Sequence, residues 1–315
     1  MKKIISLCLI VTICVGLLCG CVENIEGDGN HKPRLFGATY MTRNNPYFNV
    51  LNETLEDTIE ANGDILISRD PCQQQDKQNA QILEMIDEGI EVLFLNPVDW
   101  EKVRPALEAC REAGVVVINV DTEVKDKDYV ISYIETDNYL AGVLCAQDMM
   151  KQIDRARIVI LDNPIQTSIS NRVQGFLDTI AGNDNYQVIY TEAGKGEFEV
   201  SANVTSEFLK KNVPFDVVLG GNDPTALGAL AALQQQGMEK KILIYGIDGS
   251  PDFKAMLDLG YVTGTAAQSP KTIAEVAADT AYRYLNGEEV QKYICIDPYL
   301  ISRRNLNAFE INSWQ

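Results

Sequence analysis

Planar polar side chains follow several short apolar runs of this chain. They occupy six such positions: Asn45, Asn96, Asp121, Asn222, Asp248 and Gln268. Each amide or carboxylate can make two or more directed hydrogen bonds. Two aromatic rings, Tyr47 and Phe48, follow the first of these positions, and Arg172 adds a cation on an expected helix. Because polar groups of this kind bracket hydroxyls while rings face the C–H side of a sugar, the set predicts a carbohydrate site.

A simpler explanation exists for each residue alone. Asn, Asp and Gly after strands are the ordinary residues of turns and helix N-caps. In open α/β sheets, however, ligands bind beyond the carboxyl ends of the strands. Six residues with that same placement therefore favour a binding site over six unrelated caps.

The elements that must position these residues alternate along the chain. Short apolar runs, several of them continuous as in strands covered on both faces, occupy 35–40, 64–68, 92–95, 115–120, 130–134, 157–161, 187–190, 216–219, 242–247 and 261–266. Segments with 3.6-residue periodicity lie between them, for example 80–86, 103–110 and 173–180. This alternation predicts an α/β fold with parallel sheets. About ten strands exceed one twisted open sheet, so we expect two lobes.

Length and charge limit the classes of partner. A chain of 315 residues with 46% hydrophobic residues can bury a large core, and two domains are expected at this length. The net charge of −18 argues against nucleic acid as a partner, because phosphate contact needs a basic face.

The N-terminal segment has the features of a secretory signal. Two lysines precede an apolar run over 4–18, and residues 18–21 read Leu-Cys-Gly-Cys. The pattern resembles a bacterial lipobox, in which Cys21 would receive lipid after removal of 1–20 and would anchor the protein outside the cytoplasm. The alternative is an uncleaved anchor, although this run is shorter than the ~20 residues that span a bilayer. The polar, Gly-rich residues 21–33 would be a tether.

The remaining cysteines do not form a metal or disulfide pattern. They are widely spaced, without a C-x-x-C pair, at Cys72, Cys110, Cys145 and Cys295. We expect Cys110 and Cys145 to be core residues, and a Cys72–Cys110 disulfide stays open. The sole histidine, His31, lies in the tether, so no metal site is expected. The acidic stretch 121–128 lacks the framing of a calcium loop and is interpreted as a solvated loop.

Three motifs resemble those of the type I periplasmic binding proteins, in particular the ribose-binding branch of sugar ABC importers. They are Met-Thr-Arg-Asn-Asn-Pro-Tyr-Phe at 41–48, Asn-Asp-Pro-Thr-Ala-Leu-Gly-Ala-Leu at 222–230 and Gly-Ile-Asp-Gly-Ser-Pro at 246–251. The resemblance runs from about Pro33 to Ile301. It implies two Rossmann-like lobes joined by three crossovers, one lobe being 33–135 plus 269–297 and the other 136–268 plus 298–315.

The same resemblance implies roles for the polar set. Hydrogen bonds to the sugar are expected from Asn45, Asn96, Asp121, Arg172, Asn222, Asp248 and Gln268. Tyr47 and Phe48 would sandwich the sugar ring, and Phe198 is the candidate for a further ring. Relatives of the ribose type carry arginine immediately after the position of Asp121, where this chain has Thr122. That departure argues against ribose itself as the ligand.

The resulting expectation is a lipid-anchored, monomeric solute-binding protein without a cofactor. It would capture a monosaccharide or similar polyol between two lobes and deliver it to an ABC permease. A sensor that presents its closed form to a chemoreceptor or kinase is the alternative. An enzyme is disfavoured because the folded body lacks a G-x-S-x-G elbow, a Walker loop and histidine, although a hydrolase using Asp121 and Asp248 stays open. A related repressor would begin with a DNA-binding motif rather than a signal peptide.

Overall fold

Two sheets of six strands each organise the part of the chain that the computed structural model describes, residues 32–315. Cys21, the expected signal peptide and most of the tether lie outside the described residues. Among the helices that are described, none is long and apolar enough to cross a membrane.

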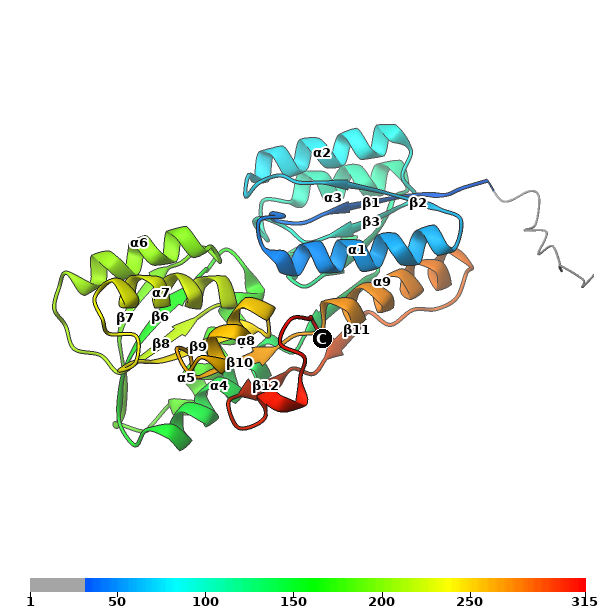
Figure 1. Ribbon diagram of the computed structural model, residues 1–315. Coiled ribbons are helices and arrows are strands. Elements are labelled where there is room, and N and C mark those ends of the chain that lie inside the picture. Colours follow the sequence, from blue (N-terminus) through cyan, green and yellow to red (C-terminus); the bar gives the residue numbers. More distant parts are fainter. Residues whose placement is uncertain (1–31) are drawn as a thin grey trace, which may run out of the picture. The chain divides into compact units, whose positions relative to one another are not determined.

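The first sheet consists of parallel strand pairs in the order β11-β5-β4-β3-β1-β2. Its strands are β1 (Leu35–Thr39), β2 (Ile65–Arg69), β3 (Val92–Leu95), β4 (Val116–Val120), β5 (Ser132–Thr136) and β11 (Tyr293–Ile296). One face is covered by α1 (Pro46–Ala61) and α9 (Pro270–Leu285), and the other by α2 (Gln75–Glu88) and α3 (Arg104–Ala113) (Figure 1). A short 3₁₀ turn, η1, spans Lys127–Tyr129.

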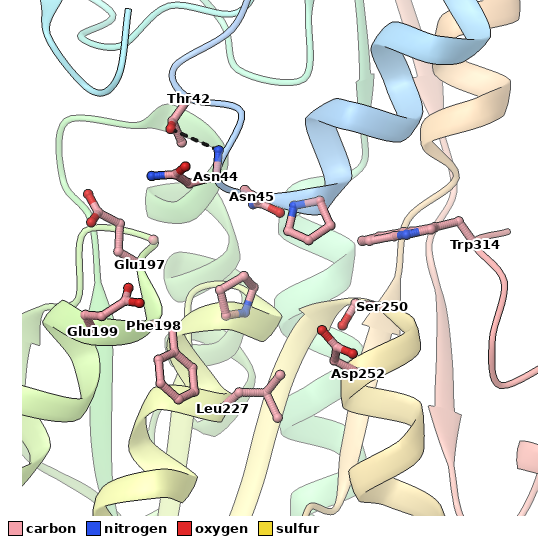
Figure 2. A pocket seen from close by; sticks show the side chains of 13 residues that line it. Thr42, Asn44, Asn45, Glu197, Phe198, Glu199, Leu227, Ser250, Asp252 and Trp314 are labelled. Atoms are coloured by element: carbon pink, nitrogen blue, oxygen red, sulfur yellow. Dashed lines mark hydrogen bonds between the residues drawn. The ribbon is translucent and has the colours of Figure 1, made fainter. Parts of the chain in front are cut away.

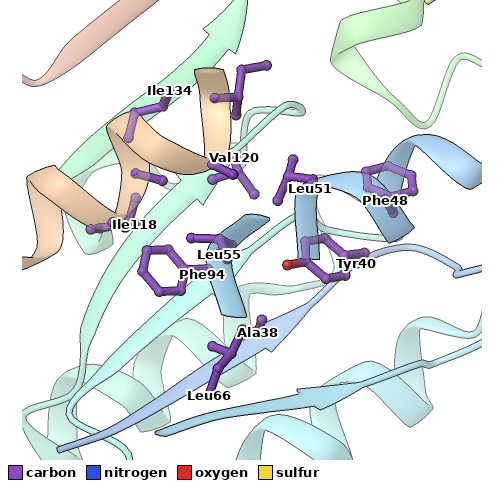
Figure 3. Packing of buried hydrophobic residues seen from close by; sticks show 14 of the residues in the cluster. Ala38, Tyr40, Phe48, Leu51, Leu55, Leu66, Phe94, Ile118, Val120 and Ile134 are labelled. Atoms are coloured by element: carbon purple, nitrogen blue, oxygen red, sulfur yellow. The ribbon is translucent and has the colours of Figure 1, made fainter. Parts of the chain in front are cut away.

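The core between this sheet and α1 follows from the period of the helix. Leu51, Leu55 and Ile59 recur every four residues on one face of α1, and all three are fully buried. They pack against inward side chains of the sheet such as Phe94 and Ile118 (Figure 3). Strand β3 is buried at every position because helices cover both of its faces.

The second sheet has the order β12-β10-β9-β8-β6-β7 and is parallel except at β12. Its strands are β6 (Ala156–Asp162), β7 (Tyr186–Ala193), β8 (Val217–Gly220), β9 (Leu243–Asp248), β10 (Gly264–Ala267) and β12 (Tyr299–Ser302). Side chains of α4 (Asn138–Gln152) and α5 (Thr167–Ile180) form the core on one face. Those of α6 (Phe198–Leu209), α7 (Asp223–Gln235) and α8 (Pro251–Asp258) form it on the other.

The chain passes between the two sheets at three places among the described residues. It leaves the first sheet after β5, returns through α9, which packs on α1, and leaves again between β11 and β12. The α/β fold with two parallel sheets is therefore as predicted. The residues at which each lobe begins and ends stay a prediction.

Strands β11 and β12 have no counterpart among the predicted runs. Every residue of β11 is exposed or partly exposed, and β12 is buried at two of its four positions. Both are nevertheless short apolar runs, Tyr-Ile-Cys-Ile and Tyr-Leu-Ile, which the sequence analysis missed.

The two helices on one face of the second sheet pack unusually closely. A Cβ atom on Gly142 of α4 would lie 1.8 Å from the Arg172 carbonyl oxygen, and one on Gly175 of α5 would lie 2.0 Å from that of Tyr139. Only glycine allows the two backbones to approach this closely. This contact fixes the position of the helix that carries Arg172.

All four cysteines of the described residues are free thiols. Cys110 and Cys145 are fully buried, as predicted, and burial raises the pKa of both thiols. Cys72 is exposed, so the Cys72–Cys110 disulfide that the sequence left open is not formed.

Candidate functional site

A small polar cavity collects most of the predicted site residues. Its volume is about 20 Å³, and it is lined by Met41, Asn45, Tyr47, Phe48, Asp121, Gln166, Ser168, Ile169, Arg172, Asn222, Asp248 and Gln268. Of the nine predicted residues, only Asn96 is missing from this lining. We call this the inner cavity. Its walls come from segments that follow strands of both sheets. This is the expected place for a site in open α/β sheets, where ligands bind beyond the carboxyl ends of the strands.

Two lining residues also cap helices. The Asn45 side chain accepts a hydrogen bond from the backbone N–H of Tyr47 at the start of α1, at 3.0 Å. The Asn222 side chain accepts one from the N–H of Thr225 at the start of α7, also at 3.0 Å. The capping role and the cavity lining are thus compatible, because each amide keeps an N–H donor: Asn222 Nδ2 gives one hydrogen to the Gly196 carbonyl at 3.1 Å and has a second.

Asp121 follows β4 with a backbone φ of 65°, a conformation that costs a non-glycine residue about 1–3 kcal/mol. Its carboxylate accepts hydrogen bonds from Asn96 Nδ2 at 2.9 Å and Thr122 Oγ1 at 3.0 Å. Burial raises the pKa of Asp121, and the positive charge of Arg172 partly offsets this effect. Strain and burial together mark a residue whose position the surrounding structure enforces.

Asn96 lies behind Asp121 and is fully buried. Besides its bond to Asp121, its Oδ1 accepts from the backbone N–H of Met41 at 3.1 Å. In this arrangement Asn96 orients Asp121 and joins the loop after β1 to the end of β4. The sequence expected a direct ligand contact, whereas this geometry supports a positioning role.

Asp248 ends β9 with a φ of 146° and is 2% exposed. Gln268 Nε2 donates to Asp248 Oδ1 at 2.7 Å. The other carboxylate oxygen, Oδ2, and the amide oxygen Oε1 of Gln268 have no hydrogen-bond partner. Burial and the negative charge of Asp223 raise the pKa of Asp248 well above its ordinary value.

Arg172 enters the cavity from α5 and is 3% exposed. Its Nε donates to Asn138 Oδ1 at 2.8 Å and its Nη1 donates to the Gly221 carbonyl at 3.0 Å. Nη1 also lies 3.9 Å from Asp248 Oδ1. The guanidinium is thus held by neutral groups and reaches the carboxylate only at the limit of an ion pair.

The two aromatic rings contact each other. Tyr47 and Phe48 meet edge to face, with centroids 5.2 Å apart and an interplanar angle of 87°. Perpendicular rings in contact do not form two parallel walls, so in this arrangement they do not sandwich a sugar ring as expected. Adjacent residues of one helix turn point about 100° apart, which explains the geometry.

A larger cavity, which we call the outer chamber, adjoins the inner cavity through their shared residue Asn45. Its volume is about 500 Å³. Figure 2 shows Thr42, Asn44 and Asn45 on one side of it and Trp314 on another. Phe198, the predicted further ring, lines this chamber rather than the inner cavity and is 41% exposed.

The sequence reasoning missed several wall residues. They include Met41, Gln166, Ser168 and Ile169 in the inner cavity and Trp314 in the outer chamber. Gln166 donates to Met41 Sδ at 2.9 Å, and the hydroxyls of Ser168 and Thr122 lie 2.8 Å apart. Each pair brings together residues far apart in the chain, so no local pattern indicates them.

The chemistry of the inner cavity is that of hydrogen bonding to a small polar molecule. It offers two carboxylates, a guanidinium, amides and hydroxyls. Among the described residues, no group of three or more His, Cys, Asp or Glu side chains is arranged to hold a metal ion.

Comparison with known proteins agrees with this architecture. A family model described as "Periplasmic binding protein domain" matches residues 36–289. The ribose import binding protein RbsB of Bacillus subtilis is 28% identical over 93% of this chain and 97% of its own length. The galactofuranose-binding protein YtfQ of Escherichia coli is 28% identical over 71% of this chain and 74% of its own. The crystal structure of the Caulobacter myo-inositol binding protein with myo-inositol superposes with a TM-score of 0.82 at 25% identity, covering 88% of this chain and 97% of that one.

Proposed function

The chain belongs to the periplasmic binding protein domain family, and from that premise we propose that it captures a sugar or similar polyol for an ABC importer. The relatives named above are binding proteins for ribose, galactofuranose and myo-inositol. One of them, RbsB, is named an import binding protein, and this favours delivery to a permease over the sensor alternative.

The observation that carries the proposal is a pair of unsatisfied acceptors inside the inner cavity. Asp248 Oδ2 and Gln268 Oε1 are both on side chains that are 2% exposed, and both lack a partner. A buried polar atom without a hydrogen bond costs about 1–3 kcal/mol. A ligand with several directed donors would remove that cost, and polyols have such donors on every carbon.

The size of the inner cavity indicates that binding requires movement. A volume of about 20 Å³ is comparable to the ~10–15 Å³ that one water molecule needs. Contacts such as Thr122–Ser168 connect segments of the two sheets across it. The structure thus corresponds to a closed arrangement without room for a sugar. We infer that the sheets separate to admit the ligand and that a ligand preferring the closed form shifts the equilibrium toward it.

We assign ligand contact to Asn45, Tyr47, Phe48, Asp121, Arg172, Asn222, Asp248 and Gln268, and the positioning of Asp121 to Asn96. The proposed lobes are 33–135 plus 269–297 and 136–268 plus 298–315. The sequence supports a lipid anchor on Cys21, which would keep a monomeric protein near its permease. Family members are binding proteins, and we propose that the ligand leaves unaltered.

Calorimetry with pentoses, hexoses and polyols tests the proposal. We expect at least one compound to bind and Asp248→Ala and Asp121→Ala to weaken it about 30-fold or more, as loss of a buried charged partner does. Absence of binding by the whole panel would contradict the proposal. Recovery of altered ligand after long incubation would instead favour an enzyme.

A further inference from the structure

The inner cavity holds more carboxyl groups than cations, and two of its buried oxygen atoms have no hydrogen-bond partner. We propose that its ligand is a sugar or polyol bearing a primary amine, whose ammonium group contacts Asp248 Oδ2 and Gln268 Oε1. This inference rests on the proposed function and names the chemical class of ligand for that same site.

The charges that line the inner cavity do not balance. Two carboxylates, Asp121 and Asp248, face a single guanidinium, Arg172. A third carboxyl group, Asp223, is fully buried next to Asp248. A second buried cation, Lys254, lies near Asp223. Three carboxyl groups therefore share two cations, and one carboxyl group is left without a cationic partner.

Neither cation donates a hydrogen bond to Asp248, although Arg172 lies close enough to lower the pKa of that carboxyl group. Arg172 is held by Asn138 and Gly221 and stays 3.9 Å from Asp248 Oδ1. Lys254 Nζ donates to the carbonyls of Glu310 and Ser313 at 2.7 and 2.5 Å. The interior of a protein screens charge weakly, so an excess buried carboxylate attracts a cation strongly.

Acceptors also outnumber donors among the fully buried lining atoms that have no hydrogen-bond partner. Asp121 already receives hydrogen bonds from Asn96 and Thr122. The fully buried lining atoms without a geometric hydrogen bond are Asp248 Oδ2, Gln268 Oε1 and the Tyr47 hydroxyl, which interacts with the Asp121 carboxylate. Gln268 Oε1 accepts only, Asp248 Oδ2 accepts when its carboxyl group is ionised, and the hydroxyl can donate or accept.

An ammonium group fits this demand better than a hydroxyl does. It donates three hydrogen bonds and accepts none, whereas a hydroxyl donates one and needs donors of its own. A hydrogen bond between charged groups is also roughly twice as strong as a neutral one. An amine on the ligand therefore satisfies both acceptors and the charge at once.

Proton release is a consequence that calorimetry can detect. Burial and the charge of Asp223 raise the pKa of Asp248, while Arg172 and the hydrogen bond from Gln268 lower it; Asp121 adds to the rise. When an ammonium group binds, the Asp248 carboxylic acid gives its proton to solvent and pairs as the carboxylate. The affinity for an amine should consequently fall as the pH is lowered.

Matched ligand pairs test the inference on the purified protein. Each pair differs by one hydroxyl-to-amine replacement: D-glucose and D-glucosamine, D-galactose and D-galactosamine, and inositols with their aminodeoxy forms. We expect an amine to bind about 30-fold or more tightly than its neutral partner. Its binding enthalpy should depend on the ionisation enthalpy of the buffer, because a proton is released.

Two variants connect the preference to this site. Asp248→Asn keeps the shape of the side chain but cannot carry a negative charge, and we expect it to abolish the preference for the amine. Gln268→Glu should raise the preference, because it places a second carboxylate there. Asp258→Asn is the matched control, since it removes an exposed carboxylate at the other end of α8, and it should leave both affinities within about 2-fold, as for a solvent-screened charge.

The results of these titrations distinguish a failure of the amine inference from a failure of the proposed function. Tighter binding of the neutral member of a pair overturns the amine inference and leaves the binding function intact. An amine preference that survives Asp248→Asn also overturns it. Lack of binding by every compound in the set contradicts both.

Discussion

Trp314 lies edge-on to Tyr47, with ring centroids 5.9 Å apart and an interplanar angle of 70°. Tyr47 belongs to α1 and lines the inner cavity, whereas Trp314 belongs to a C-terminal segment that Lys254 of α8 holds. The segment thus connects the helix after β9 with a ring of the site, and Trp314 also lines the outer chamber.

Trp314→Ala should weaken ligand binding by up to about 10-fold, because an aromatic pair contributes about 0.5–1.5 kcal/mol. Trp314→Phe should recover most of the loss, since it restores a ring against Tyr47. The measurement is calorimetry with the ligand identified in the panel. Trp100→Phe changes the other tryptophan and should leave affinity unchanged; an equal loss in both variants would contradict a role for this contact.

Lys254→Met should destabilise the protein by about 2–3 kcal/mol, because it removes a buried ammonium that serves several acceptors. Its Nζ donates to Glu310 O, Ser313 O and Gln315 Oε1 at 2.5–3.3 Å. Urea unfolding measures the loss, and hydrogen exchange should accelerate in residues 310–315. Lys271→Met replaces an exposed lysine and serves as control. Unchanged exchange in this segment would show that Lys254 does not hold it.

Gly175→Ala should lower the free energy of unfolding by more than about 2 kcal/mol, because overpacking forces the α4 and α5 backbones apart. The added Cβ would lie 2.0 Å from the Tyr139 carbonyl oxygen. Gly237→Ala is the matched control: its φ is 64°, but nothing lies within 4 Å of the added atom. The control should cost only about 1 kcal/mol. Gly175 is helical, so alanine adds no backbone strain there; a loss no larger than that of the control would contradict the packing explanation.

Glu135 should make folding stability depend on pH. Burial and the charges of Glu123 and Asp121 raise its pKa to about 8 from 4.5. The contribution of Glu135 to the free energy of unfolding is therefore fully present below about pH 4.5. It is lost as the pH rises through 8, because the buried carboxyl group must then ionise in the folded protein.

Thermal or urea unfolding between pH 5 and 9 checks this dependence. Glu135→Gln should remove a slope worth on the order of 1–2 kcal/mol across that range. Glu91→Gln, at an exposed position, should retain the slope. A wild-type stability that rises with pH, or a slope that Glu135→Gln leaves intact, would contradict the assignment.

The sequence determined the fold class and most of the inner cavity by itself. Alternating apolar runs and periodic segments predict parallel sheets, and the carboxyl ends of parallel strands meet at one edge. Asp121 and Asp248 could be placed in a common site because Asp121 directly follows β4 and Asp248 ends β9. Helix caps such as Asn45 and Asn222 are local signals as well, since a cap bonds within three residues of itself.

Only the tertiary structure decided which polar atoms lack a hydrogen-bond partner and which residues complete the walls of the two cavities. Asp248 Oδ2 lacks a hydrogen-bond partner because of where Arg172 and Gln268 lie. The packing of distant segments sets the positions of these two side chains, and it includes the glycine contact between α4 and α5. Trp314 reaches Tyr47 across more than two hundred residues of chain. Such contacts come from the mutual packing of distant segments, and the local periodicities that reveal strands and helices carry no information about them.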